Sequence, residues 1–356
     1  MVHHITPPEE EIAAKPCPLL SIIIPVYNVK TRDIERCLNS IYTNSLPHDE
    51  FEVICVNDCS TEQSGLDAIA DFKTDGAHPD NLIVTKTREN VRQGGARNHG
   101  MSIAKGEYIQ FIDQDDFFTP GFMQTLKKSI EANPGFDIIM HDYTDGNENG
   151  DYDPSDGYYT KRNHGNPADG GEFLKQQEVP WAPWNYLYRN EFLVKGLKLR
   201  FEEKVRFEDA DFVLAVTMNA KRIIFRPEVI LVHTISTYQT SAVGNSFDRI
   251  IDFTNMFHRV GKVAEKGKEC GMEGADQITS HHVFGYTSSI KRYLWRLPYG
   301  ELKKTVVKYP PSGSAASRSR LLHLAKYNPG VFACMLWTAK PFLHGVYFVY
   351  KRILKR

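Results

Sequence analysis

Seven-residue apolar runs recur along the first 142 residues and alternate with stretches of helical pattern. The runs begin roughly 25–30 residues apart, which is the length of a strand, a covering helix and two turns. Each run is apolar throughout, as expected for strands covered on both faces. The pattern therefore predicts parallel strands joined by crossover helices, with strands at residues 20–26, 51–57, 81–87, 107–113 and 136–142.

The pattern changes after the fifth run. Residues 143–170 are rich in Gly, Asp and Asn without any period, which predicts a long loop. A helix is predicted over 207–220, followed by two short β runs at 223–226 and 229–233. From about residue 246 onward, apolar residues recur at helical spacing. We expect three parts: a polar leader (1–18), an α/β domain (19–240) and a helical C-terminal region (241–356).

The composition is that of an ordinary globular protein, with 41% hydrophobic residues, 24% charged residues and a net charge of −1. The N-terminus lacks the charged start and apolar stretch of a signal peptide. The six cysteines form no CxxC pair, which suits free thiols in a reducing compartment. These features predict a cytoplasmic protein.

Charge is unevenly distributed along the chain. Residues 291–356 contain 14 Lys and Arg but one acid, so the preceding residues carry an excess of negative charge. Aromatic and aliphatic residues interleave with the cations over 331–354, which favours an anionic membrane surface over nucleic acid. Lys340 and Pro341 interrupt this stretch, so we expect it to lie on a membrane rather than cross it. The alternative is a helix packed on the protein with a solvated basic face.

Polar clusters follow three of the predicted strands. They lie at Pro25–Asn28, Asn57–Thr61 and Asp113–Asp116. In a doubly wound sheet, ligands bind at the carboxyl ends of the strands. We therefore expect the three clusters to converge on one site.

The sequence FIDQDD places Asp113, Asp115 and Asp116 directly after an apolar strand. Clustered carboxylates repel one another unless a cation is present. Hard oxygen ligands suit Mg²⁺ or Mn²⁺, which completes its coordination with phosphate and water. The alternative, capping of the next helix, accounts for one or two of the three acids.

Two further segments carry candidate binding groups. Asp58 follows a strand and is placed to accept hydrogen bonds from a base or ribose, although turn formation alone also explains it. Gly94 and Gly95 allow close backbone approach ahead of Arg97 and Asn98 on a predicted helix. Arg97 is a candidate for contact with a diphosphate, and a surface arginine is the alternative.

Glu208 and Asp209 open the predicted helix at 207–220. A carboxylate beside a donor substrate can take a proton from an acceptor hydroxyl. Acids in the first turn of a helix are also common partners of its dipole. Local spacing alone does not choose between these roles.

Taken in order, six motifs resemble the family 2 glycosyltransferases: SIIIPVYN, VNDCST, GGARNHG, FIDQDD, WNYLYR and FEDADF. The resemblance covers roughly residues 19–240. It implies the GT-A fold, a Rossmann-like, mostly parallel central sheet with flanking helices, here followed by a helical C-terminal region. It also implies inverting transfer from a nucleotide-sugar, of the kind used for bacterial surface glycans.

The resemblance assigns roles to individual residues. It implies nucleotide contacts at Pro25, Tyr27, Asn28, Asp58, Arg97, Asn98, Asp113 and Asp115, with Asp115 and Asp116 serving the metal. Asp209, next to Glu208, matches the family's general base, and Trp184 and Asn185 lie on the acceptor side. His233 is a further candidate for the metal or diphosphate, with a structural histidine as the alternative.

Two departures from the family pattern are visible. The family usually reads DDGS where this chain has Asn57-Asp58-Cys59-Ser60, and VHTISTYQTS replaces a tyrosine-arginine element. The QxxRW motif of processive synthases is missing, which favours transfer of one sugar per encounter.

We therefore expect a UDP-sugar donor, a glycan or lipid-linked acceptor, Mn²⁺ or Mg²⁺, and peripheral attachment to the inner face of the cell membrane. One alternative is a sugar-1-phosphate nucleotidyltransferase, which should carry a glycine-rich phosphate loop after its first strand, whereas PVYNVKT has no glycine. The other is an inactive glycan-binding module, which should have lost the acid cluster or Asp209.

Overall fold

The computed structural model describes residues 17–43, 45–74, 80–159, 167–176, 181–235 and 246–340. Predictions for most of the leader, for part of the 143–170 loop, for the end of the VHTISTYQTS segment and for the tail beyond residue 340 lie outside these residues.

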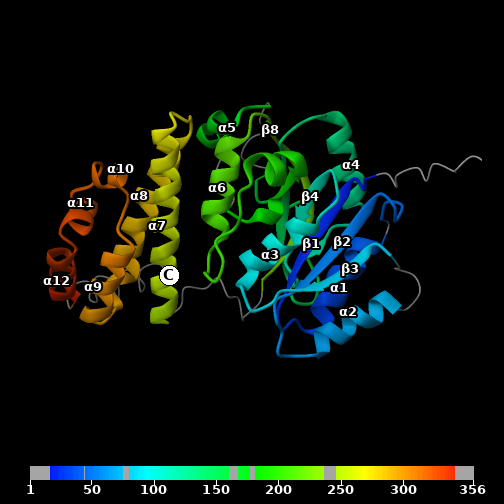
Figure 1. Ribbon diagram of the computed structural model, residues 1–356, viewed down its shortest axis with the longest axis horizontal. Helices are drawn as coiled ribbons and strands as arrows, with labels where there is room; N and C mark the ends of the chain where they lie inside the picture. The colour runs from blue at the N-terminus through cyan, green and yellow to red at the C-terminus, as the bar shows by residue number, and fades with distance from the viewer. Residues whose placement is uncertain are drawn as a thin grey trace, which may run out of the picture.

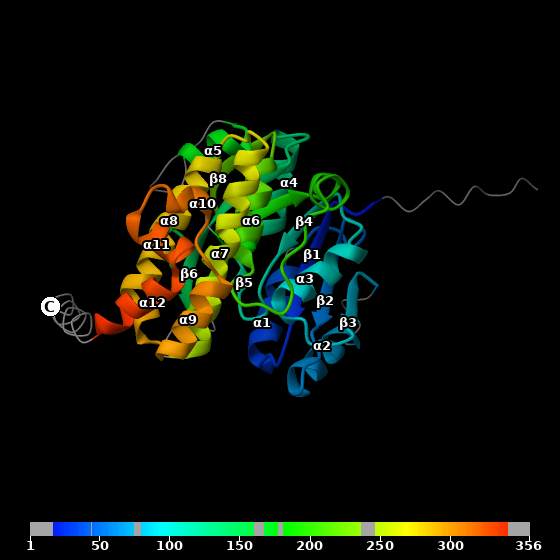
Figure 2. The same cartoon turned by 60° about the vertical axis from the view of Figure 1, so that its left-hand side comes forward.

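The described residues form one eight-stranded mixed sheet in the order β3-β2-β1-β4-β7-β6-β8-β5. Helices α1–α6 flank it and α7–α12 form a separate layer (Figures 1 and 2). The strands are β1 (Leu20–Val26), β2 (Phe51–Asn57), β3 (Leu82–Lys86), β4 (Tyr108–Phe111), β5 (Phe117–Phe118), β6 (Ile138–Asn147), β7 (Tyr186–Arg189) and β8 (Ile223–Ile235). The flanking helices are α1 (Thr31–Tyr42), α2 (Ser64–Thr74), α3 (Arg92–Ile103), α4 (Phe122–Ala132), α5 (Gly170–Gln176) and α6 (Asp209–Asn219).

The first half of the sheet confirms the predicted α/β pattern. Strands β1 and β2 are buried along their whole length, and β1 pairs in parallel with both β2 and β4. Helix α1 buries Ile34, Cys37, Leu38 and Ile41, whose helical spacing forms one apolar face. The crossover helices thus hold the carboxyl ends of β2, β1 and β4 side by side.

The second half of the sheet keeps the predicted parallel direction and adds two short antiparallel strands, β7 and β5. Strand β7 inserts between β4 and β6 and is antiparallel to both. Its short sequence, YLYR, pairs with β4 over Leu187–Arg189 and with β6 over Tyr186–Tyr188, and the first three of its residues are buried between these neighbours. Non-local pairing of this kind leaves no periodic signal in so short a segment.

Two local predictions were wrong. Part of the predicted loop at 143–170 is strand, because β6 extends to Asn147 alongside β8. The two short β runs form one strand, β8, whose pairing skips from Arg226 to Val229 as a bulge. Pro227 lies in this gap, where its missing N–H costs no ladder hydrogen bond.

The C-terminal helices stack on the α/β domain through α7, which lies beside α6 in both views (Figures 1 and 2). Buried apolar residues run continuously from the sheet into these helices. The helices are α7 (Phe247–Glu269), α8 (Ala275–Arg292), α9 (Tyr299–Lys308), α10 (Gly313–Ala316), α11 (Arg320–Tyr327) and α12 (Pro329–Thr338). No helix in the described ranges combines the length and apolar character needed to span a bilayer.

Candidate active site

The three polar clusters do meet at the carboxyl ends of β1, β2 and β4. The Gln114 side chain bonds both the backbone N–H and the carbonyl of Tyr27, at 2.8 and 3.0 Å. Asn28 Oδ1 accepts from the backbone N–H of Thr61 at 2.8 Å. Pro25 is buried at the end of β1, while Tyr27 is 44% exposed. The loops are therefore joined into one surface with an available aromatic ring.

Asp58 is buried at the end of β2 and organises the neighbouring loop. Its Oδ1 accepts from Thr87 Oγ1 and from the backbone N–H of Val91, both at 2.9 Å. The hydrogen bonds of the Asp58 carboxylate within the described residues all go to Oδ1. Its second oxygen is the one suited to a ligand N–H or hydroxyl.

Arg97 lies at the centre of the site, on α3, with its side chain 2% exposed. It donates to Asp113 Oδ1 at 2.7 Å and to Glu208 Oε1 at 2.8 Å, and its guanidinium lies 5.3 Å from the centre of the Phe201 ring. The alternative of a surface arginine is wrong. Two carboxylates occupy its fork, so the geometry favours positioning of Asp113 and Glu208 over direct contact with a diphosphate.

Asn98 also points into the protein and bonds its backbone. Its amide accepts from the N–H of Phe201 and donates to the Phe201 carbonyl, both at 2.9 Å. This exchange fixes the segment leading to Glu208 against α3. Gly94 makes the close approach possible, since a Cβ there would lie 2.7 Å from Glu208 Cγ and 2.8 Å from the Glu202 carbonyl oxygen.

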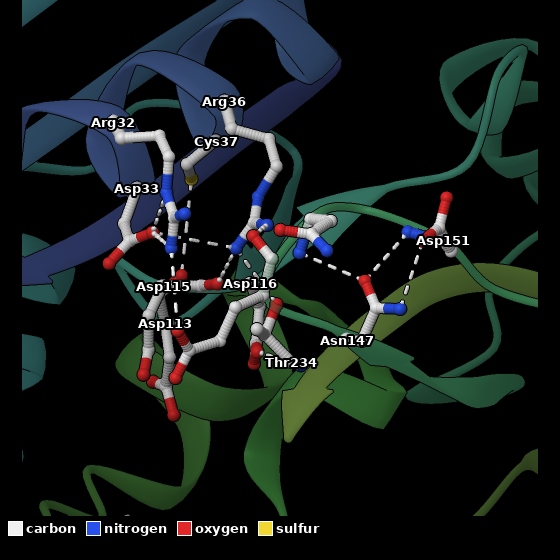
Figure 3. A network of polar contacts seen from close by, with 12 residues as sticks. Arg32, Asp33, Arg36, Cys37, Asp113, Asp115, Asp116, Asn147, Asp151 and Thr234 are labelled. Carbon is white, nitrogen blue, oxygen red and sulfur yellow. Dashed lines mark hydrogen bonds and ion pairs between the residues drawn. The ribbon is translucent and has the colours of Figure 1, made fainter. Parts of the chain in front are cut away.

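Asp115 and Asp116 sit together after β4, as Figure 3 shows. Loss of hydration, followed by repulsion from Asp113, raises the pKa of the still accessible Asp115 carboxyl to about 6. Burial, and after it repulsion from the Asp115 carboxylate, raises the pKa of Asp116 well above its usual range. Asp116 Oδ1 accepts from the backbone N–H of Thr234 at 2.8 Å. The protein alone thus only partly compensates the charge that the two carboxyls carry when they are ionised.

A divalent cation fits this donor set, because its charge would offset both the loss of hydration and the mutual repulsion that raise the two pKa values. In the parts of the chain that the structure describes, no three His, Cys, Asp or Glu side chains are already arranged as a metal-binding group. Mg²⁺ and Mn²⁺ are commonly held by one or two carboxylates, with phosphate and water as their remaining ligands.

The predicted acceptor-side residues and His233 form an aromatic wall. The Trp184 ring stacks on His233, with centroids 5.7 Å apart, and meets Tyr143 edge-on at 4.7 Å. His233 Nδ1 lies 3.0 Å from Asp145 Oδ1. Asn185 is 1% exposed and donates to the His141 carbonyl at 3.3 Å, so it supports the wall from behind.

Glu208 and Asp209 begin α6 but have different surroundings. Glu208 is buried against Arg97, whereas Asp209 is partly exposed. Burial, followed by the adjacent Glu208 carboxylate, raises the pKa of Asp209 to about 7, and Arg97 opposes this rise. Of the two acids, Asp209 is the one with the access and basicity of a proton acceptor near neutral pH.

The C-terminal helices hold this end of α6 in place. Arg259 of α7 donates to Asp211 Oδ1 at 2.9 Å and to the Phe207 carbonyl at 2.6 Å. Arg206 Nη1 lies 2.6 Å from Asp252 Oδ2. The start of the helix that carries Asp209 is therefore fixed from both layers.

Left-handed backbone gathers around the site. Asn28, Cys59, Arg92 and Phe207 all have φ between 47° and 62°. Cys59 occupies the position at which the family motif has glycine, and the left-handed φ of 58° explains that glycine physically. Strained positions of this kind are characteristic of functional loops.

Sequence reasoning missed three polar residues of the site. Gln93 donates to Asp113 Oδ1 at 2.7 Å, Gln114 joins the first and third loops, and Arg36 donates to the Asp115 carbonyl at 2.8 Å. Arg36 lies in an amphipathic helix, where a charged residue reads as part of the solvated face. No sequence signal separates it from its neighbour Arg32.

Comparison with known proteins relates this part of the chain to a family of enzymes. Residues 21–191 match the family described as Glycosyl transferase family 2. The matched segment is a family 2 glycosyltransferase domain. An uncharacterized glycosyltransferase EpsJ of Bacillus subtilis is 33% identical over 210 residues, which is 58% of this chain and 58% of that protein. The chain thus covers less than two thirds of the length of that relative.

Solved structures agree on the architecture. S. aureus TarS 1-349 in complex with UDP-GlcNAc matches with a TM-score of 0.60 at 18% identity, over 90% of both chains. Mannosyltransferase PcManGT from Pyrobaculum calidifontis, in complex with GDP-Man and Mn²⁺, matches with a TM-score of 0.55 at 18% identity, over 92% of this chain and 85% of that one. At these identities the likeness establishes the GT-A type of fold, including the C-terminal helices within the matched region.

Proposed function

We propose that this family 2 protein is an inverting glycosyltransferase that moves a sugar from a UDP-sugar to an acceptor hydroxyl of a cell-surface polysaccharide or glycolipid. The observation that carries the proposal is the bridge made by Arg97 between Asp113 and Glu208. It links the acids after β4 to the start of α6, where Asp209 lies. Donor-binding acids and a candidate base are thus held at one edge of the sheet.

In this proposal the nucleotide lies across the carboxyl ends of β1 and β2. The exposed Tyr27 ring stacks on the base, and Asp58 accepts a hydrogen bond through the oxygen that the loop leaves unused. UDP is favoured as the nucleotide because the structurally similar S. aureus TarS carries UDP-GlcNAc. Asn28, Arg97 and Asn98 act by fixing the surrounding loops.

Asp115, Asp116 and His233 would hold a Mn²⁺ or Mg²⁺ ion, which would supply positive charge to the departing diphosphate. Asp209 takes the proton of the acceptor hydroxyl. At the same time the hydroxyl oxygen forms a bond to the anomeric carbon of the donor sugar, and the bond between that carbon and the diphosphate oxygen breaks. The incoming and leaving oxygens are on opposite faces, so the anomeric centre inverts. Glu208 and Arg97 keep Asp209 oriented, and Trp184 backs the acceptor side.

A screen of nucleotide-sugars tests this reaction. The purified protein is expected to be stabilised thermally by one UDP-sugar with Mn²⁺ and to hydrolyse it slowly without acceptor. NMR of the sugar released or transferred should show the anomeric configuration opposite to that of the donor. Retention of configuration, or stabilisation by sugar-1-phosphates and UTP instead, would contradict the proposal.

We further propose that the protein sits on the anionic inner face of the cell membrane through α9 and α12. The outward stripe of α9 carries Lys303, Lys304 and Lys308, and α12 exposes Val331, Met335 and Trp337. The two helices pack together, and the Tyr299 and Trp337 rings are 5.9 Å apart. Cations beside exposed apolar side chains suit a lipid headgroup layer, which would bring a lipid-linked acceptor close to the enzyme.

A further inference from the structure

Arg36 has contacts that none of the roles above requires. It projects from α1, with its side chain 17% exposed, and meets three segments that are distant in sequence. Its Nη2 donates to the Asp115 carbonyl at 2.8 Å and to Thr234 Oγ1 at 3.0 Å, and its Nη1 donates to the Glu148 carbonyl at 3.0 Å. Figure 3 shows these contacts converging on the guanidinium beside the acids.

The same network reaches a carboxylate. The hydroxyl of Thr234 accepts a hydrogen bond from Arg36. The backbone N–H of Thr234 donates to Asp116 Oδ1 at 2.8 Å. The Arg36 guanidinium also lies 4.8 Å from the centre of the Phe117 ring, which packs the group against the end of the acid segment. One planar fork therefore joins α1, the segment after β4, the end of β6 and the end of β8.

We propose that Arg36 is a positioning residue that fixes the acid loop, residues 113–116, against the ends of β6 and β8, so that Asp115 and Asp116 present their carboxylates together to a cation-bound diphosphate. This inference rests on the proposed function for the identity of that ligand. Two of the three bonds go to backbone carbonyls, so the role depends on the fork geometry and not on charge alone.

Arg32 supplies a matched control on the same helix. It is 55% exposed and contacts Asp33 and Glu148 Oε2, at 3.4 and 3.7 Å. Within the described residues, its side-chain hydrogen bonds and ion pairs go to Asp33 and Glu148 and do not reach residues 113–118 or Thr234. Arg32→Lys should therefore leave both the loop and ligand binding unchanged, whereas Arg36→Lys keeps the charge and removes the fork.

Calorimetry of UDP binding, with Mn²⁺ and with EDTA, measures the effect on the ligand. For Arg36→Lys, we expect UDP affinity in EDTA within about twofold of the parent protein, and a loss of about tenfold in the increase that Mn²⁺ brings. The unchanged affinity in EDTA would show that the base site is folded. A Mn²⁺ response in Arg36→Lys equal to that of the parent would overturn the proposal, because charge alone would then suffice.

Hydrogen exchange in the ligand-free protein separates this inference from the proposed function. In Arg36→Lys, the backbone amides of Asp116 and Thr234 should exchange about tenfold faster than in the parent protein. In Thr234→Val, which removes only the hydroxyl that accepts from Arg36, the Asp116 amide should exchange about threefold faster. Unchanged amide exchange in both variants would overturn the positioning role of Arg36, whatever the effect of the variants on UDP binding. Faster exchange in the variants, together with a UDP affinity of the parent protein that does not respond to Mn²⁺, would support the positioning role of Arg36 and refute the proposed donor site.

Discussion

At the carboxyl edge of the sheet, arginines are buried against carboxylates and carbonyls, whereas the cations of α9 stand in solvent beside apolar side chains. Arg97 is 2% exposed and joins Asp113 to Glu208, but Lys304 is 77% exposed and pairs only with Glu301 in the described residues. The number of cations is thus less informative than their surroundings.

The difference has a physical consequence. A buried, hydrogen-bonded ion pair fixes side-chain positions, and loss of one partner leaves an uncompensated charge at a cost of about 3–5 kcal/mol. An exposed lysine fixes little, but its field extends about 10 Å at moderate ionic strength and adds to that of its neighbours. The first region is built for geometry and the second for attraction to a charged surface.

The largest expected effect is at Asp209. Asp209→Asn should lower transfer by about 10³-fold, the usual contribution of a positioned general base, while UDP affinity stays within about twofold. Initial rates and calorimetry measure the two quantities. Glu202→Gln, an exposed acid before the same helix, is the control and should be active. Full turnover by Asp209→Asn would exclude Asp209 as the base.

Acidic pH should act through the same group. Asp209 must be ionised to accept a proton, and burial together with Glu208 raises its pKa to about 7. With this pKa about half of the Asp209 carboxyl is ionised at pH 7 and about 1% at pH 5, so kcat/KM should drop about fiftyfold from pH 7 to pH 5. The residual activity of Asp209→Asn should lack this component. An identical acid limb in the variant would assign the titration to another group.

The helical region should respond to charge removal at a distance from the chemistry. Each basic residue near an anionic surface contributes about 1 kcal/mol, so Lys303→Gln with Lys304→Gln should weaken binding to anionic vesicles about 30-fold. UDP affinity should be unchanged. Lys86→Gln with Lys105→Gln removes two exposed cations of the α/β domain and should have no effect. Equal losses in both double variants would refute a specific membrane-facing surface.

At the acid pair, Asp115→Ala should reduce the gain in UDP affinity caused by Mn²⁺ by roughly tenfold or more, because it removes a carboxylate ligand. Affinity in EDTA should remain, since Asp58 and Tyr27 belong to the base side of the site. Calorimetry with both conditions distinguishes the two. A parent-like Mn²⁺ response would remove Asp115 from the metal site.

The smallest expected effect is a gain in stability. Cys59 has φ of 58°, a conformation that costs most residues about 1–2 kcal/mol relative to glycine. Cys59→Gly should therefore raise the free energy of unfolding by up to about 1 kcal/mol, after loss of the Sγ contact to the Thr87 carbonyl. Denaturant unfolding measures this change. Destabilisation would mean that the thiol contact outweighs the backbone strain.

Much of the site was predictable because its chemistry follows strands whose ends must meet. Asp58, Asp113 and Asp115 each come directly after an apolar run, so their convergence follows from parallel pairing of β1, β2 and β4. The roles of Arg97 and Asn98 were not predictable in the same way: both were expected to contact the nucleotide, whereas in the structure their side chains bond carboxylates and backbone of the protein itself. Burial by the segment before α6 turns them inward, and that segment is about a hundred residues away.

The sequence by itself determined the α/β domain, the position of its acid cluster and the concentration of cations at the C-terminal end, since each depends on local periodicity or composition. Only the tertiary structure decided that β7 separates β4 from β6, that Glu208 is tied to Arg97 while Asp209 stays accessible, and that Arg36 reaches the acid loop. These features arise from contacts between distant segments, whose geometry depends on how the layers pack and not on any pattern along the chain.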